Sequence, residues 1–340
     1  MDSWFSWMLG TVVVLWLTRW FLRQIGIGFS GLRTAPEDPK SPPPLGIKQL
    51  SDAVYLLHEP EGTPEIDIVF IHGLQLSEYK DAYWKTWTVP VDGTGEEICW
   101  PQTWLSEEFP NARISSVSYD SSALRTESRG RGDVYVVGES LVAEMVEFGQ
   151  IGQQRPVLFV CHSLGGLVIK EVVIQAYRQH HDEEKYKNFL NNIRGFFFYA
   201  TPHAGSKLAD LAIALPLPSE KGPMLKHLEA LGDTNSRLDS EFKTITDLPE
   251  FPNKWKFSVV AEKNATKMGN FSALVVSEAS ATYGGRRPYF ANLDHFQVCK
   301  PTSKKASVFQ KLTNFIVEDI MMSEKITTGA QVRENAKLLM

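Results

Sequence analysis

The sequence is poor in the features that mark several large protein classes. Its 340 residues include only three cysteines, Cys99, Cys161 and Cys299, which are too few for the disulfide framework of a small secreted domain. The formal net charge of −5, with no lysine and arginine cluster longer than a pair, argues against a nucleic-acid partner. No His and Cys spacing typical of zinc, no phosphate-binding loop and no Gly-x-Gly-x-x-Gly after a strand is present, so we predict no metal and no cofactor.

The chain contains enough apolar residues for one large globular domain with an appendage, because 43% of its residues are hydrophobic and 22% are charged. Residues 49–58 and 65–72 have the β-branched and aromatic content of strands, whereas 139–148 and 164–180 have helical character. This alternation predicts an α/β fold, with a mostly parallel sheet and helices on both faces.

The N-terminus is apolar from Trp4 to Leu22 apart from Ser6, Thr11, Thr18 and Arg19, and it carries tryptophans at both ends. This pattern predicts a transmembrane anchor helix over residues 1–25. Residues 26–48, with three consecutive prolines, read as a linker. Arg19, Arg23 and Arg33 follow the uninterrupted apolar stretch, which ends near Leu17, and this favours a cytosolic position for the rest of the chain. A mitochondrial targeting helix or a helix lying in the membrane interface are the alternatives.

The most informative segment is 157–170, an apolar strand that runs directly into Ser163, two glycines and a helix-forming stretch. This is the pattern of a nucleophile elbow, in which a strained turn presents the serine and the next N–H, here that of Leu164, faces an oxyanion. Gly165 supplies the small residue that the turn needs after the serine, but Cys161 stands where glycine is usual before it. The alternative is an ordinary loop between a strand and a helix.

Other segments follow in a consistent order. The strand 66–71 leads into His72-Gly73, where the N–H of Leu74 is expected to complete the oxyanion site. A buried strand at 195–199 precedes Thr201-Pro-His, and later apolar segments at 256–261 and from Ala273 onward are expected to be strands. A serine, then an acid, then a histidine is the chain order of α/β-hydrolases, so we predict the α/β-hydrolase fold.

A serine nucleophile needs a histidine base, and the base needs an acid. Of the eight histidines, His295 is the one that follows the last predicted strands, whereas His162 is expected to point elsewhere on the elbow. Glu262, at the end of the 256–261 strand, is the predicted acid. Glu278 and Asp294 are its rivals.

At these positions the chain resembles the serine-active-site-containing, lipase-like esterases, which are related to GPI inositol-deacylase and serine esterase domains. The resemblance covers about residues 66–316 and is carried by six segments: Phe70-Ile-His-Gly-Leu, Trp100-Pro-Gln-Thr-Trp-Leu, Pro110-Asn-Ala-Arg-Ile, Cys161-His-Ser-Leu-Gly-Gly, Tyr199-Ala-Thr-Pro-His-Ala-Gly-Ser and Asp294-His-Phe-Gln-Val-Cys-Lys-Pro. It implies a hydrolase or acyltransferase that acts on a lipid ester, phospholipid remodelling included, and that is attached to the endoplasmic reticulum or mitochondria.

These observations predict a hydrolase domain over residues 49–322, with a loose tail at 323–340. Within it, residues 207–250 carry leucines at helical spacing and are expected to form a cap over an acyl pocket, helices packed on the core, or both. The predicted protein is a membrane-anchored serine esterase with a lipid ester as substrate. A hydrolase-fold membrane scaffold without turnover and an esterase of soluble substrates are the alternatives.

Overall fold

A computed structural model describes residues 43–75, 79–91, 94–121, 133–203, 236–249, 251, 255–268, 271–276, 281–283 and 287–322. The chain divides into two compact units, Met1–Pro42 and Pro43–Met340, and the described residues all belong to the second. The predicted anchor over 1–25, the linker up to residue 42, the first part of the predicted cap, Glu278 and the tail over 323–340 lie outside them. None of the helices in the described ranges has both the length and the apolar character that a membrane crossing requires.

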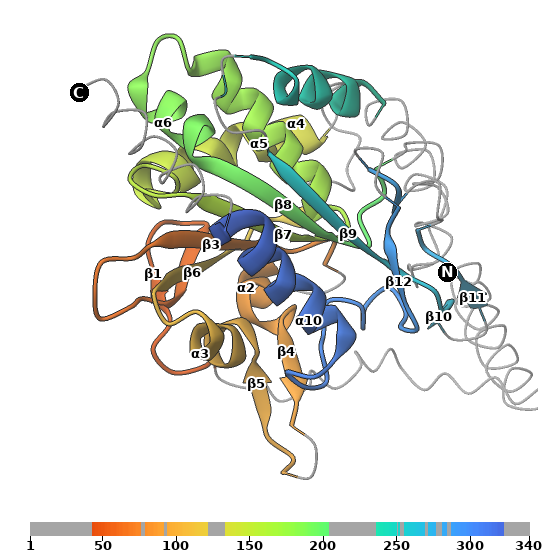
Figure 1. Ribbon diagram of the computed structural model, residues 1–340. Coiled ribbons are helices and arrows are strands. Elements are labelled where there is room, and N and C mark those ends of the chain that lie inside the picture. Colours follow the sequence, from red (N-terminus) through yellow and green to blue (C-terminus); the bar gives the residue numbers. More distant parts are fainter. Residues whose placement is uncertain are drawn as a thin grey trace, which may run out of the picture. The chain divides into compact units, whose positions relative to one another are not determined.

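The second unit is built on an eight-stranded sheet (Figure 1). In spatial order its strands are β1 (Lys48–Gln49), β2 (Val54–His58), β6 (Ala112–Val117), β3 (Ile66–Ile71), β7 (Val157–His162), β8 (Ile193–Tyr199), β9 (Lys256–Glu262) and β12 (Tyr289–Ala291). The β1–β2 and β2–β6 pairs are antiparallel, and every later pair from β6 to β12 is parallel. Two small hairpins, β4 (Thr88–Pro90) with β5 (Glu97–Cys99) and β10 (Thr266–Met268) with β11 (Phe271–Ala273), stand apart from this sheet.

Helices cover both faces of the sheet, as Figure 1 shows. One face carries α4 (Asp133–Ala143), which continues in π-helical turns over Glu144–Phe148, together with α5 (Gly165–Gln179) and α6 (Glu184–Asn192). The other face carries α2 (Ala82–Lys85), α3 (Ser106–Glu108), which follows a π-helical turn over Pro101–Leu105, and α10 (Ser307–Asn314), which is extended by π-helical turns over Phe315–Met321. The expected parallel sheet with two helical layers is therefore confirmed.

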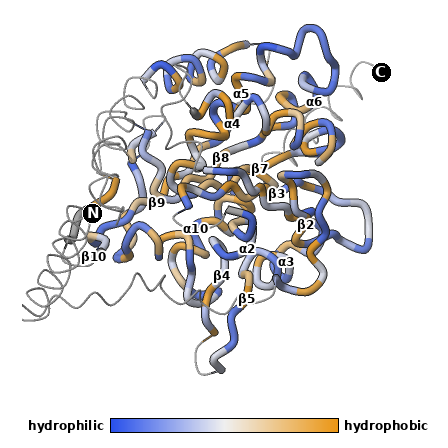
Figure 2. Tube along the Cα trace, turned by 180° about the vertical axis from the view of Figure 1, so that it is seen from behind, coloured by the Kyte–Doolittle hydropathy of each residue, from blue (hydrophilic) through white to orange (hydrophobic). Residues whose placement is uncertain are grey.

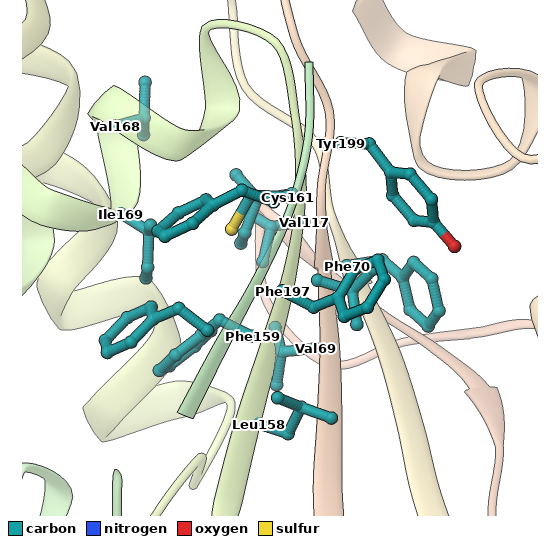
Figure 3. Packing of buried hydrophobic residues seen from close by; sticks show 14 of the residues in the cluster. Val69, Phe70, Val117, Leu158, Phe159, Cys161, Val168, Ile169, Phe197 and Tyr199 are labelled. Carbon is teal, nitrogen blue, oxygen red and sulfur yellow. The ribbon is translucent and has the colours of Figure 1, made fainter. Parts of the chain in front are cut away.

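The core lies on both sides of the central strands. All six residues of β3 and of β7 are buried, which is typical of parallel strands sandwiched between helices. In Figure 2 the hydrophobic colour gathers where β3, β7 and β8 lie, and hydrophilic colour dominates the outer turns. Figure 3 shows how the core is divided: Ile169 of α5 lies on one side of the strands and Tyr199 on the other, where its hydroxyl donates to the carbonyl of Val308 in α10.

Two predicted elements differ from the structure. The segment 49–58, expected to be one strand, is the turn of a hairpin followed by β2, because Leu50 and Ser51 both donate to the carbonyl of Val54. The segment from Ala273 onward was expected to be a strand, but the β10–β11 hairpin ends at Ala273. Its β-branched Val275 and Val276 are buried in a loop, where the N–H of Val276 donates to a glutamate side chain and not to a neighbouring strand.

The described end of the predicted cap is a helix over 236–246 that packs on the core. Its buried side chains are Leu238, Phe242 and Ile245. Phe242 contacts Phe196 of β8 edge to face, with ring centroids 5.4 Å apart. The described part of the segment therefore packs on the core, and the cap stays a prediction.

Candidate active site

Ser163 occupies a strained turn between β7 and α5. Its backbone φ is 52°, which is rare for any residue other than glycine and is the conformation expected of a nucleophile elbow. The turn is held from the neighbouring strand, because the N–H of Ser163 donates to the carbonyl of Tyr199 at 2.8 Å. Such strain persists only where the surrounding structure enforces it, so the turn is a built feature.

Main chain packs against main chain around this turn. A Cβ atom added at Gly165 would collide with the carbonyl oxygens of Ile71 and His72, and one added at Gly73 would stand 2.8 Å from the Cβ of Ser163. Both glycines are therefore required where the loop after β3 meets the elbow. This close approach puts that loop beside the serine.

Cys161 is the departure from the usual elbow pattern. Its side chain is fully buried and points to the face of the sheet that α5 covers, the side on which Ile169 lies (Figure 3). Burial raises the pKa of the thiol well above its usual value, so the group is neutral. Cys161 therefore behaves as a small core residue.

The structure brings the three predicted catalytic side chains together. The Nε2 atom of His295 lies 2.8 Å from the Oγ of Ser163, and its Nδ1 atom lies 3.3 Å from the Oε1 of Glu262. All three side chains are at most 2% exposed. Because a carboxylate only accepts, Nδ1 carries the hydrogen and Nε2 presents a lone pair to the serine hydroxyl.

Glu262 is held as an acceptor at the end of β9. Its Oε1 also accepts the N–H of Val276 at 2.6 Å, which fixes the carboxylate against the imidazole. Of its rivals, Asp294 uses its Oδ1 to accept the N–H groups of Phe296 and Gln297, at 3.0 and 2.9 Å, and so stabilises its own turn. Among the described carboxylates, Glu262 is therefore the one in contact with the Nδ1 of His295.

The predicted oxyanion donors flank the serine. Leu164 follows it directly and stands at the start of α5. Leu74 follows Gly73, whose main chain touches Ser163. Their role as donors stays a prediction.

His72 holds the loop that carries Leu74. Its ring stacks on Tyr119, with centroids 4.3 Å apart, and its Nε2 accepts the N–H of Tyr119 at 3.2 Å. The other ring nitrogen donates to the carbonyl of Gly73 at 2.7 Å. Burial lowers the pKa of His72 to about 4, so the ring is neutral and can make both bonds.

His162 is closer to the site than the sequence suggested. It was expected to point elsewhere on the elbow and not to serve as the base, and its Nε2 lies 2.9 Å from the main-chain carbonyl oxygen of His295. Strand alternation is a signal that predicts this: Cys161 points toward α5, so the residue after it points to the opposite face. Thr266 was not predicted either, and its Oγ1 accepts the N–H of His295 at 3.1 Å.

The strand order, the elbow after β7, the acid at the end of β9 and the histidine after β12 together define an α/β-hydrolase fold. A family model described as "Putative serine esterase (DUF676)" matches residues 67–273, which include Ser163 and Glu262. The chain belongs to this serine esterase family. His295 lies beyond the matched range, and its place in the site comes from the geometry alone.

Curated relatives of this serine esterase domain carry the name "Protein SERAC1". The protein from Mus musculus is 30% identical over 291 residues, which are 80% of this chain and 42% of the relative. The one from Bos taurus is 31% identical over 283 residues, which are 78% of this chain and 41% of the relative. The chain thus spans about two fifths of the length of these relatives.

Solved structures that overlap with the chain include the lipase BlEst2 of Bacillus licheniformis in mature form. It has a TM-score of 0.48 and 19% identity, and the overlap covers 76% of this chain and 97% of the lipase. The phospholipase PlaB of Legionella pneumophila has a TM-score of 0.45 and 15% identity, with 79% of this chain and 64% of the phospholipase covered. The fold assignment rests on the strand order and the elbow, not on these partial overlaps.

Proposed function

We propose that this protein is a serine hydrolase of ester bonds, with Ser163 as nucleophile, His295 as base and Glu262 as the acid that orients it. The observation that carries the proposal is the continuous chain of hydrogen-bond contacts from Ser163 to His295 to Glu262, with the serine on a strained elbow. Membership of a serine esterase family supports it.

The proposed reaction begins when the Oγ of Ser163 attacks the ester carbonyl and its proton passes to the Nε2 of His295. The Glu262 carboxylate stabilises the imidazolium that forms. The N–H groups of Leu164 and Leu74 would bind the negative oxygen of the tetrahedral intermediate. His295 then returns the proton to the leaving alcohol, which leaves an acyl-enzyme.

The second half of the reaction releases the acyl group from Ser163. A water molecule, or the hydroxyl of another lipid, gives its proton to the Nε2 of His295 and attacks the acyl carbonyl. The intermediate collapses, the proton returns to the Oγ of Ser163, and either an acid or a new ester is released. Hydrolysis and transfer between lipids, as in phospholipid remodelling, therefore need the same three side chains.

A lipid ester is the proposed substrate, because the apolar run from Trp4 to Leu22 would anchor the enzyme at a membrane of the endoplasmic reticulum or mitochondria. We place the hydrolase domain on the cytosolic side. Asn264 tests this orientation, since it begins an Asn-Ala-Thr acceptor sequence and is exposed. After expression in animal cells, Asn264 should carry no glycan. Added mass that a glycosidase removes, and that is missing from the Asn264→Gln variant, would contradict the cytosolic orientation.

The substrate proposal is tested with the full chain in lipid vesicles. One set of vesicles contains a long-chain phospholipid ester, and the other is supplied with a short-chain ester that dissolves in water. We expect faster turnover of the vesicle-borne ester, and none of either by the Ser163→Ala variant. Preference for the dissolved ester would indicate a soluble substrate, and absence of turnover of both would favour the scaffold without activity.

A further inference from the structure

His295, the base of the proposed reaction, lies in a segment with little regular structure. Residues 292–300 form turns, without a helix or strand to fix them. The Nε2 of His295 must nevertheless stay within hydrogen-bond distance of Ser163, a residue 132 positions earlier in the chain. The main chain at His295 therefore needs other attachments.

Side chains hold both main-chain polar groups of His295. Its N–H donates to the Oγ1 of Thr266 in β10, at 3.1 Å. Its carbonyl lies 2.9 Å from the Nε2 of His162. A carbonyl only accepts, so the Nε2 of His162 carries the hydrogen of that neutral ring.

His162 is suited to this bond because it stays neutral. Its side chain is buried at 6% exposure, and burial is the main reason why its pKa is lowered to about 3. The nearby His295, Lys300 and His72 lower this pKa further. The centroid of the His162 ring lies 5.1 Å from that of His295. A positive charge on His162 would therefore destabilise the imidazolium of His295 that forms during the reaction.

We propose that His162 is a positioning residue, which ties the catalytic base to the turn that carries the nucleophile. His162 directly precedes Ser163, so a single hydrogen bond connects the elbow to the main chain of His295. The inference rests on the proposed function, because it assigns His162 a role through His295. Misplacement of a reacting group by about 1 Å can cost about 100-fold in rate, so the loss of such a bond affects chemistry more than substrate binding.

Three substitutions separate the hydrogen bond from the bulk of the ring. In His162→Gln the side-chain amide nitrogen reaches about as far as Nε2 and can donate to the same carbonyl. His162→Leu has a similar volume without a donor. His162→Asn keeps an amide donor, but its side chain is too short to reach the carbonyl of His295. It replaces the leucine variant as the test if that variant does not fold.

With a water-soluble ester and the full chain, the Leu and Asn variants should lose about 10- to 100-fold in kcat, with KM changed less than about 3-fold. The Gln variant should stay within about 3-fold of the unsubstituted protein in both constants. Equal losses in all three variants, or no loss in Leu and Asn, would overturn the proposal.

Hydrogen exchange of the peptide 294–300 gives a readout that needs no activity. We expect faster exchange in the Leu and Asn variants and unchanged exchange in the Gln variant, at equal overall stability. Unchanged exchange in all three would overturn the positioning role whether or not the protein turns over esters. If the unsubstituted protein shows no turnover, the proposed function fails separately, and exchange still decides whether His162 fixes the segment.

Discussion

Glu262→Gln tests the acid of the proposed triad. The Oε1 of Glu262 accepts from both the N–H of Val276 and the Nδ1 of His295. In the glutamine variant the amide oxygen should occupy this place, because Val276 needs an acceptor. The imidazole then keeps its orientation and loses only the negative charge beside it.

The expected loss follows from that charge. At an effective dielectric constant of about 20, a carboxylate roughly 4 Å from an imidazolium contributes about 4 kcal/mol. The imidazolium exists only after proton transfer, so this energy stabilises the transition state and not the resting enzyme. We therefore expect kcat to fall by about 10³-fold, with little change in KM.

The assay is steady-state hydrolysis of a water-soluble ester at pH 7.5, with Asp294→Asn as the matched control. The asparagine keeps the oxygen that accepts from Phe296 and Gln297, so its activity should stay within about 3-fold of the unsubstituted protein. A Glu262→Gln enzyme with more than about a tenth of the original kcat would refute the assignment of the acid. A large loss in Asp294→Asn alone would point to Asp294 instead.

Further predictions concern stability, measured by urea unfolding. The Lys170 ammonium is fully buried and donates to the Asp239 carboxylate at 2.6 Å, whereas Asp239 is 35% exposed. Asp239→Ala should cost about 3 kcal/mol because it leaves the buried ammonium without this carboxylate, and Lys170→Met should cost about 1 kcal/mol because Asp239 can be hydrated instead. Equal losses in the two variants would contradict this expectation. Gly165→Ala should cost about 3 kcal/mol or more through its collision with main-chain carbonyls, whereas Gly62→Ala, with open space around it, should change stability by less than about 0.5 kcal/mol. The pKa of His162 is about 3 in the folded protein, against an ordinary value of 6.5. Between these two pH values the unfolded chain binds more protons than the folded one, so stability should fall as the pH falls. At pH 5 the loss due to His162 should be about 2 kcal/mol, and His162→Gln should remove this pH dependence.

The strands and the order of the site residues were predictable because they depend on local patterns. An apolar run that ends in small or polar residues marked β3 and β7 to within a residue or so of their observed bounds. The helix expected over 164–180 is α5, Gly165–Gln179. The elbow glycine was predictable for the same reason, since its requirement arises within a few residues of the serine.

Other features depend on contacts between distant segments, which periodicity does not report. Lys170 lies in an apolar helix and is buried there because Asp239, 69 residues away, accepts from its ammonium and the ring of Tyr283 lies 4.3 Å from it. Val275 and Val276 have the composition of a strand, but their loop is set by the bond to Glu262. The contact of His162 with His295 likewise joins residues 133 positions apart.

Labelling with a fluorophosphonate probe tests whether His295 activates Ser163. The probe reacts with an activated serine hydroxyl and needs no knowledge of the substrate. We predict that the folded full chain is labelled at Ser163, identified by peptide mass, and that Ser163→Ala and His295→Ala are not labelled. No labelling of the folded, unsubstituted protein, or labelling that persists in Ser163→Ala, would contradict the assignment of Ser163 as an activated nucleophile.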